Sequence, residues 1–376
     1  MSDLMRIAPA LLEEWMREYY FATELDIGSS GVESFSLAEI RALLGISHDE
    51  LDRIVFNDSE TLGGLGLRKA VADRYGNGDL SRVIATHGSS EAIFLIMTAL
   101  LRSGDEVVVL DPCYQQLYSI AEVIGCKLKS WPLRFSNGFV PDVDEAKRLI
   151  TSRTRMIVVN FPHNPTGASL SLEQQNELVE AAARVDAYLV WDAAFEELTY
   201  DTAPLPAPVH YQRAITMGTL SKAFGLPGLR VGWCLASPDV LERFVLLRDY
   251  TNLHLSPLIE LIAQRAIEQA PVLVGKRLQQ ARINLEILAS WCEEHRDFVE
   301  WAPPRGGVCS FLRLRRVKDV EEFCRHLAHS HGVLLVPGSC FKHPSHVRLG
   351  FGDATARVRE GLWRLSAALK SIESNA

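Results

Sequence analysis

The chain has 376 residues, of which 47% are hydrophobic and 23% are charged, and its formal net charge is −8. This length can bury the cores of one large domain and one smaller domain. The negative balance, without any basic stripe, argues against a nucleic-acid-binding surface. Seven cysteines are scattered singly, without CxxC or metal-ligand spacing. We therefore expect reduced thiols, no disulfide framework and no bound metal.

The N-terminal segment MSDLMRIAPALLEEWMREYY is amphipathic and rich in acidic residues, unlike a basic region followed by an apolar signal stretch. Its pattern predicts a helix over about residues 9–20, which we expect to pack with the smaller domain. The longest apolar run, Ala92 to Leu101, is too short to cross a bilayer, which takes about 20 residues. We expect a cytoplasmic protein that does not associate with a membrane.

Strands and helices are predicted to alternate in the middle of the chain. Three short apolar runs rich in β-branched residues, at 107–110, 156–160 and 188–191, are typical of strands buried on both faces of a parallel sheet. The pattern of 171–185 predicts a helix with Ser171 as its N-cap. Such alternation predicts a doubly wound α/β domain.

The C-terminal third predicts a second unit. A long helical stretch follows Pro257 and runs to about Glu294, and GGVCSFLRLR at 306–315 reads as a strand. Strand and helix patterns then alternate to the end, which indicates a smaller α+β domain. The expected division is 1–57 for the N-terminal helix and segment, 58–257 for the large domain and 258–376 for the small domain.

Polar residues gather at the ends of the predicted strands, where open α/β sheets bind their ligands. The stretch THGSSEAI combines Gly88, Ser89 and Ser90 at the start of a helix. Glycine permits close approach of the backbone, and free N–H groups at a helix start favour a phosphate. The alternative is a serine N-cap with nothing bound.

Three further positions carry chemistry in the same part of the chain. Asn164 opens an Asn-Pro-Thr-Gly turn, and Asp192 ends an apolar strand. Lys222 lies among small and apolar residues, and a lysine in such a pocket has a lowered pKa and can form imines. Each has an ordinary alternative: a simple turn, a solvated loop carboxylate and an exposed lysine.

Together these segments supply what pyridoxal phosphate (PLP) requires: an amine, an acid for its ring nitrogen, and donors for its phosphate and ring oxygen. Their order resembles fold-type I PLP-dependent transferases of the aminotransferase type, over almost the whole chain. The resemblance implies a large, mostly parallel-sheet domain with a smaller α+β domain, and a homodimer. It also implies that Lys222 forms the Schiff base and Asp192 pairs with the ring nitrogen.

The same resemblance assigns the remaining contacts. Asn164 donates to the ring oxygen, Tyr114 in DPCYQQLY stacks on the ring, and Arg348 in HVRLGFG binds the substrate α-carboxylate, for which a guanidinium fork is suited. The phosphate is expected to contact Ser89, Ser90, Thr219 and Arg230.

Two positions depart from ordinary aminotransferases. The usual Asp-x-x-Tyr is here Asp192-Ala-Ala-Phe195, so a hydroxyl donor to the ring oxygen is absent. Asp58 and Ser59 stand where a phosphate-binding tyrosine is usual. Neutral drift is one explanation of these differences.

A narrower resemblance offers another explanation. The motifs DIGSSGV, THGSSEA, VVNFPHNPTGA, WDAAFEEL and GTLSKAFGLPGLRVGWC are similar to those of capreomycidine synthases, in which Phe195 fits. This implies a lyase-type cyclodehydratase that deprotonates Cα of a hydroxylated L-arginine, expels water and closes the guanidine into a ring. The product is capreomycidine for a Cβ hydroxyl or enduracididine for a Cγ hydroxyl, in antibiotic or toxin biosynthesis.

Such a substrate needs further contacts. Glu13 and Glu14 are candidates to orient the guanidinium from a helix that folds over the site, Ser30 and Gly31 are expected to touch the substrate, and His163 is a candidate to help the hydroxyl leave. Surface glutamates on amphipathic helices are also common, and a turn histidine often only packs.

Two rival functions remain. An ordinary aminotransferase would release a keto acid and move the amino group to a 2-keto acid. A cofactor-binding regulator would need a DNA-binding module, yet the residues before Asp58 carry no basic helix-turn-helix pattern.

Overall fold

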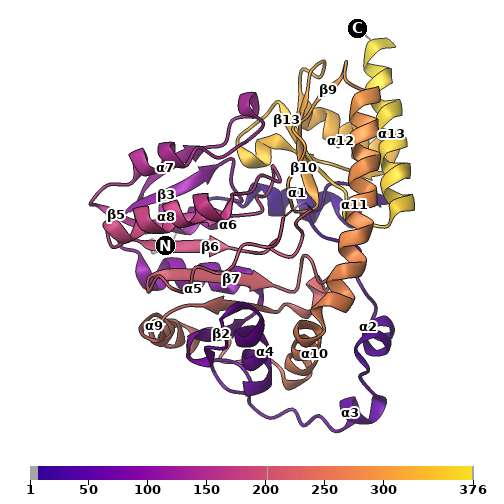
Figure 1. Cartoon of the computed structure of the whole chain (residues 1–376). Helices are drawn as coiled ribbons and strands as arrows, with labels where there is room; N and C mark the ends of the chain where they lie inside the picture. The colour runs from indigo at the N-terminus through magenta and orange to yellow at the C-terminus, as the bar shows by residue number, and fades with distance from the viewer. Residues whose placement is uncertain (1–6, 201, 375–376) are drawn as a thin grey trace, which may run out of the picture.

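The centre of the computed structural model, which describes residues 7–200 and 202–374, is a seven-stranded sheet with the strand order β2-β8-β7-β6-β5-β3-β4 (Figure 1). Strand β8 runs antiparallel to both β2 and β7, and the other strands are parallel to one another. The strands are β2 (Val83–Thr86), β3 (Glu106–Asp111), β4 (Lys127–Pro132), β5 (Thr154–Asn160), β6 (Tyr188–Asp192), β7 (Ala214–Thr219) and β8 (Gly232–Leu235). The three apolar runs predicted as strands are therefore confirmed.

Helices cover both faces of this sheet, because its strands are apolar on both sides. In β3, Val107 packs into the core under one face and Val108 into the core under the other. The first core includes residues of α5 (Gly88–Leu100), α6 (Gln116–Ile124) and α9 (Pro238–Arg248). The second includes residues of α4 (Leu65–Tyr75), α7 (Val143–Leu149) and α8 (Leu172–Arg184). The predicted cap of α8 is confirmed, since the Ser171 hydroxyl accepts from the backbone N–H of Gln174.

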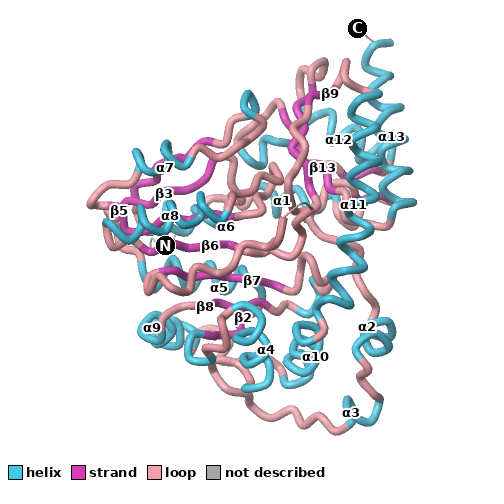
Figure 2. The backbone as a smooth tube through the Cα atoms, viewed as in Figure 1, coloured by secondary structure: helices cyan, strands magenta, loops and turns pink. Residues whose placement is uncertain are grey.

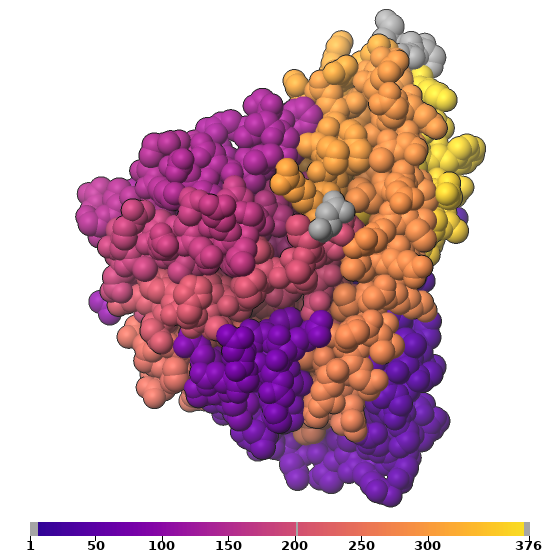
Figure 3. Space-filling view, in the orientation of Figure 1, coloured from indigo at the N-terminus to yellow at the C-terminus, as the bar shows by residue number. Residues whose placement is uncertain are grey.

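A four-stranded antiparallel sheet forms the core of the C-terminal part, in the order β12-β13-β10-β9. Helices α11 and α13 lie side by side along it, and Figure 2 shows both as long cyan coils of the backbone tube beside this sheet. The elements are α11 (Ala270–Glu294), β9 (Val299–Glu300), β10 (Cys309–Leu314), α12 (Val320–His331), β11 (Val333–Leu334), β12 (Val336–Pro337), β13 (His346–Gly350) and α13 (Thr355–Ser374). In Figure 3 this orange and yellow part forms one side of the molecule, against the magenta and pink residues of the large domain.

The predicted long helical stretch is two helices rather than one. Helix α10 (Pro257–Glu268) ends at Gln269, whose φ of −110° and ψ of 26° are not helical, and α11 begins at the next residue. Apolar periodicity continues across such a break, so the pattern alone does not reveal it.

The N-terminal segment packs against the C-terminal part. The predicted helix is α1 (Leu11–Tyr19), and the Trp15 indole N–H donates to the backbone oxygen of Leu335 at 3.0 Å. Strand β1 (Leu25–Asp26) pairs in parallel with β11, and α2 (Leu37–Leu44) and α3 (His48–Asp52) follow. These contacts support the packing of the N-terminal segment with the small domain, and we propose 1–57, 58–257 and 258–376 as the division of the chain. Within the described residues, no helix is both long and apolar enough to cross a membrane.

Candidate active site

A cavity of about 800 Å³ opens at the C-terminal ends of the parallel strands, facing the small sheet. Asn160, Asp192 and Thr219, the last residues of β5, β6 and β7, line its floor. Arg348 of β13 and residues of α1 complete the wall. This is the position at which open α/β sheets bind ligands, because the loops after parallel strands meet there.

Lys222 and Asp192 have unusual acid–base properties in this cavity. Burial, and to a lesser degree the nearby positive charge of Arg348, lower the pKa of Lys222 to about 8. An amine with this pKa is partly neutral near physiological pH, which suits imine formation. Burial raises the pKa of Asp192 to about 6. Among the described residues no cation lies within ion-pair distance of Asp192, so a protonated ring nitrogen would supply its missing partner.

The phosphate side of the cavity is built from α5 and the loop around Lys222. Ser89 and Ser90 lie in the first turn of α5, where backbone N–H groups are unpaired, and both line the cavity with Thr219 and Arg230. Ser221 also lines it and receives a hydrogen bond from the Thr219 hydroxyl at 3.0 Å. Sequence reasoning missed Ser221, although its place next to the lysine is a signal that could have found it.

The backbone leaves room for an anion at this point. Gly88 has a φ of +72°, and a Cβ built there would lie 2.8 Å from Nη2 of Arg230. A Cβ on Gly232 would meet the backbone of Gly88 at 2.6 Å. Only glycine therefore allows the start of α5, the strand β8 and the arginine to come together, and the residues present fit a phosphate group.

Arg348 and Asn164 form the opposite side of the cofactor position. Arg348 is 2% exposed, and its Nη1 donates to Oδ1 of Asn164 at 3.2 Å while its Nε donates to the backbone oxygen of Gly28 at 3.0 Å. No carboxylate pairs with Arg348 among the residues that the structure describes. The side-chain oxygen of Asn160 accepts from the backbone N–H of Asn164 at 2.8 Å and so holds the turn. This arginine is available for a substrate carboxylate.

Glu13 lines the cavity, but Glu14 does not. The hydroxyl of Tyr114 donates to Oε1 of Glu13 at 2.7 Å. Glu14, one residue further along α1, is half-exposed and lies 3.8 Å from Arg17. Successive residues of a helix point in directions about 100° apart, so only one of the two glutamates can face the site. The expectation for Glu14 is corrected on this ground.

His163 also lies outside the cavity lining. It is 1% exposed, and its Nδ1 is 2.8 Å from the hydroxyl of Thr166. Burial lowers its pKa to about 3, so the ring is neutral at physiological pH. The His163 ring packs near the Phe161 ring, whereas the neighbouring residue Asn164 lines the cavity. The structure therefore does not bring this histidine to a position from which it could protonate a substrate. Ser30 and Gly31, by contrast, both line the cavity.

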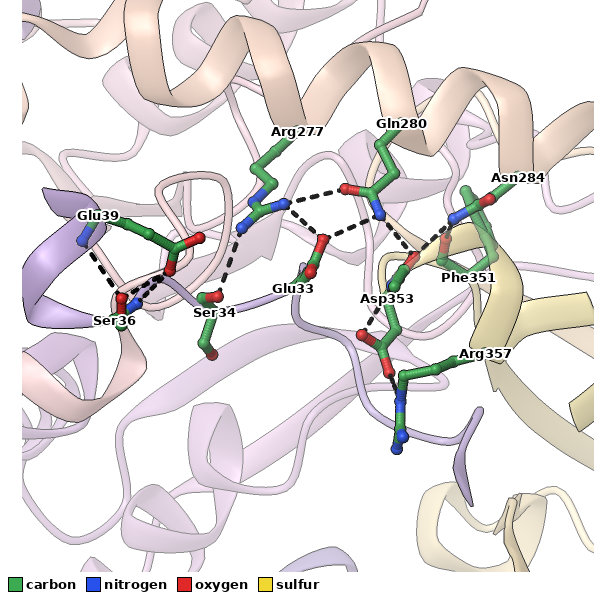
Figure 4. Close-up of polar contacts among 11 residues, drawn as sticks. Glu33, Ser34, Ser36, Glu39, Arg277, Gln280, Asn284, Phe351, Asp353 and Arg357 are labelled. Atoms are coloured by element: carbon green, nitrogen blue, oxygen red, sulfur yellow. Dashed lines mark hydrogen bonds and ion pairs between the residues drawn. The ribbon is translucent and has the colours of Figure 1, made fainter. Parts of the chain in front are cut away.

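The segment that carries Ser30 and Gly31 is held in place by α11 (Figure 4). Glu33 accepts hydrogen bonds from Arg277 at 2.7 Å and from Gln280 at 3.1 Å. The Arg277 guanidinium also lies 3.9 Å from the centre of the Phe35 ring. Because Arg277 is buried, removing Glu33 would leave a buried charge without its partner, so this network fixes the cavity wall.

Ion pairs in the same network involve some of the carboxylates that line the cavity and leave others without a cationic partner. Glu33 pairs with Arg277, and Asp353 pairs with Arg357 at 2.7 Å. Of the other carboxylates outside the cofactor position that line the cavity, Glu13 and Asp26 have no cationic partner among the described residues. One oxygen of Asp26 accepts from two backbone N–H groups, at 2.8 Å and 2.9 Å. Sequence reasoning missed Asp26, which nothing in its local pattern distinguishes.

The structure shows the contacts of the residues at both positions that depart from ordinary aminotransferases. Phe195 is 2% exposed, lines the cavity and has its ring centre 5.5 Å from Nζ of Lys222. Ser59 donates to a carboxylate oxygen of Glu260 at 2.6 Å, and Asp58 lies 3.0 Å from a ring nitrogen of His254. Neither Asp58 nor Ser59 lines the cavity of its own chain.

Fold and site together define a PLP-dependent enzyme of fold type I. The family model for aminotransferase class I and II matches residues 56–365, and the chain belongs to that family. A capreomycidine synthase from Streptomyces vinaceus is 44% identical over 96% of this chain and 93% of its own.

Solved structures agree in fold and length. The PLP-dependent cyclase OrfR is 44% identical, with 98% of each chain covered and a TM-score of 0.93. A PLP-dependent aminotransferase from Streptococcus suis is 31% identical, covers 98% of this chain and 99% of its own, and also has a TM-score of 0.93. The expected fold class, family and cofactor are thereby confirmed.

Proposed function

We propose that the protein is a PLP-dependent cyclase that converts a hydroxylated L-arginine into a cyclic guanidine amino acid. The observation that carries this proposal is the pair of unmatched charges in one cavity, the Arg348 guanidinium and the Glu13 carboxylate. Both act on the pKa of Lys222, Arg348 lowering it and Glu13 raising it. An α-amino acid with a guanidinium side chain complements both charges. The similarity to a capreomycidine synthase supports the same substrate class.

For the cofactor, we propose the roles that the motifs imply. Lys222 would hold PLP covalently, Asp192 would face its ring nitrogen, and Asn164 its ring oxygen. Tyr114 would stack on the ring. The phosphate would be held by Ser89, Ser90, Thr219, Ser221 and Arg230. The fit of these residues rests on the cation-free Asp192 and on the space that Gly88 leaves beside Arg230.

The protein's own groups then bind the substrate and move its protons. PLP, when bound, withdraws the electron pair that the Cα–H bond releases. Arg348 holds the α-carboxylate and Glu13 orients the guanidinium, while Ser30 and Gly31 contact the chain between them. Lys222 accepts the Cα proton. The hydroxyl leaves as water, and a guanidine nitrogen attacks the carbon from which it departed.

The position of the hydroxyl sets the ring size. From Cβ, water leaves directly after Cα deprotonation, and attack at Cβ gives the six-membered ring of capreomycidine. From Cγ, a second deprotonation at Cβ precedes the loss of water, and attack at Cγ gives the five-membered ring of enduracididine. Either product serves specialised metabolism, such as antibiotic or toxin biosynthesis.

Incubation with 3-hydroxy- and 4-hydroxy-L-arginine tests the proposal, with the product read by mass and NMR. We expect a product lighter by one water that contains a closed guanidine ring. The same enzyme with a 2-keto acid as acceptor tests the rival aminotransferase function, which the Streptococcus suis relative favours. Amino transfer from arginine as the dominant reaction, without cyclic product from either substrate, would refute the cyclase.

We also propose a cytoplasmic homodimer. The seven free cysteines, six of them buried, support a reducing compartment. Phe56 and Tyr250 are 75% and 91% exposed, and large exposed apolar side chains of this kind support contact with a second copy. Light scattering of the purified protein measures the assembly state directly, and a monomer at micromolar concentration would contradict it.

A further inference from the structure

Loss of a hydroxyl group needs a proton donor at the oxygen that departs. Hydroxide is a poor leaving group, and transfer of a proton by a positioned side chain typically accelerates such steps by about 10²–10⁴-fold. His163 cannot supply this proton, because it is buried outside the cavity lining. The donor must therefore be another group that reaches both the substrate and a source of protons.

Ser30 is placed between the catalytic lysine and the open cavity. Nζ of Lys222 donates to Oγ of Ser30 at 2.9 Å, although the two residues are 192 positions apart in the chain. Ser30 is 6% exposed and lines the cavity. A serine hydroxyl accepts and donates at the same time, and among the described residues no acceptor receives the hydrogen of Ser30. Its hydrogen is thus available to a ligand.

The backbone holds Ser30 rigidly at this position. The N–H of Gly350 donates to the oxygen of Ile27 at 2.8 Å, and the N–H of Glu33 donates to the oxygen of Gly352 at 3.0 Å. A Cβ on Gly350 would lie 1.8 Å from the oxygen of Ser29, so the segment packs directly on the strand β13 and its continuation. A donor that is held in this way loses little entropy when it acts.

We propose that Ser30 relays a proton from Lys222 to the hydroxyl group that leaves the substrate. This inference rests on the proposed cyclase function and deepens it. The Cα–H bond breaks, its proton goes to the neutral amine of Lys222, and its electron pair forms the Cα–Cβ double bond as the C–O bond breaks. Oγ of Ser30 gives its hydrogen to the departing oxygen and takes one from the Lys222 ammonium. Water leaves, Ser30 ends as it began and Lys222 returns to the neutral amine.

The charges around Lys222 are compatible with this direction of transfer. Arg348 lies on one side and favours release of the proton, whereas Asp192, Glu13 and the Cys309 thiol favour its retention. Burial lowers the pKa of the lysine, which makes the ammonium a better donor than an exposed lysine.

The experiment compares two reactions of the PLP-loaded Ser30→Ala variant. Exchange of the Cα proton of L-arginine in D2O requires Lys222 but no proton donor to a departing oxygen, because this ligand has no hydroxyl to lose. Cyclisation of hydroxyarginine requires the relay as well. We expect Ser30→Ala to slow cyclisation at least about 10²-fold more than it slows exchange with L-arginine. Ser30→Thr, which keeps a hydroxyl, should restore most of the rate, and Ser29→Ala is the matched control on the neighbouring residue.

The outcomes separate the relay from the proposed function. Equal slowing of exchange and cyclisation would mean that Ser30 only positions Lys222, and an unaffected cyclisation rate would mean that it does neither; both overturn the relay. If the unaltered enzyme exchanges the Cα proton of L-arginine but cyclises neither hydroxyarginine, the cyclase function itself falls, and the relay with it.

A measurement on the apoenzyme tests the contact without turnover. The hydrogen bond to Ser30 stabilises the ammonium form of Lys222, so Ser30→Ala should lower the pKa of this amine below its present value of about 8. The pH dependence of Lys222 acylation, followed by peptide mass spectrometry, reports that pKa. Ser29→Ala should leave it unchanged. An unchanged midpoint in Ser30→Ala would overturn the contact on which the relay depends.

Discussion

Replacement of Glu13 by glutamine removes one charge from the cavity and keeps the shape of the side chain. Its Oε1 could still accept from the Tyr114 hydroxyl, so the local packing is preserved. A hydrogen bond to a charged group contributes about 1.5–3 kcal/mol. Because Glu13 is half-buried, the lower half of that range applies, which corresponds to about 12- to 40-fold weaker binding of hydroxyarginine.

The matched control is Glu14→Gln, one residue along the same helix. Glu14 is half-exposed and lies beside Arg17, so this substitution removes the same charge from α1 without touching the cavity. Spectrophotometric titration of each PLP-loaded variant with L-arginine and with L-norleucine, which has no guanidinium, separates charge from general binding.

We expect Glu13→Gln to weaken the binding of arginine but not of norleucine, and to leave the ligand-free cofactor spectrum unchanged. Glu14→Gln should bind both ligands as tightly as the original enzyme does. Equal losses in the two variants would show a general effect of charge. Equal losses for arginine and norleucine would show a disturbed cavity. In either case the guanidinium partner would have to be sought at Asp26, the other carboxylate that lines the cavity outside the cofactor position and has no cationic partner among the described residues.

Three further predictions follow from the same site. Lys222→Ala should abolish turnover and the absorbance of covalently bound cofactor, and an unchanged spectrum would end the cofactor assignment. Phe195→Tyr adds a hydroxyl near Lys222 and should lower the spectroscopic pKa of the bound cofactor, so a titration with no change or a rise would count against this account. Asp192 is protonated in the folded apoenzyme up to a pKa of about 6, compared with 3.8 for the ordinary group, so its contribution to stability is complete below about pH 4 and is lost as the pH rises through 6. Between pH 4 and 7 the apoenzyme should therefore lose about 2 kcal/mol of unfolding free energy relative to Asp192→Asn in urea titrations, and parallel pH profiles would contradict this.

Local pattern predicted the elements of the large domain well. Continuous apolar runs are diagnostic when a sheet is covered on both faces, and β3, β5 and β6 lie where those runs predicted. Helix boundaries were less accurate, since the break at Gln269 follows from backbone torsions that leave the apolar pattern uninterrupted. The short helices α2 and α3 were not predicted at all.

The cofactor residues were accessible from the sequence for a related reason. Asp192 ends a strand, and Asn164 and Lys222 lie in the loops that follow β5 and β7; the C-terminal ends of parallel strands must meet at one edge of the sheet. Polar residues that follow successive parallel strands in the sequence therefore lie close together in space. Ser221 and Asn160 could have been found by the same rule.

No such rule predicts from the sequence which side chains line the substrate side of the cavity. Which of Glu13 and Glu14 faces inward depends on how α1 is rotated, and that rotation is set by the packing of Trp15 against distant backbone. His163 has the residue type for acid chemistry but packs outside the cavity lining. Ser30 meets Lys222 across 192 positions because the N-terminal segment lies along β13. The sequence by itself determined the fold class and the cofactor chemistry, since these depend on regular elements and their ends, and the resemblance of its motifs indicated the family. Only the tertiary structure decided which side chains share the substrate's space, because that depends on helix rotation and on long-range packing.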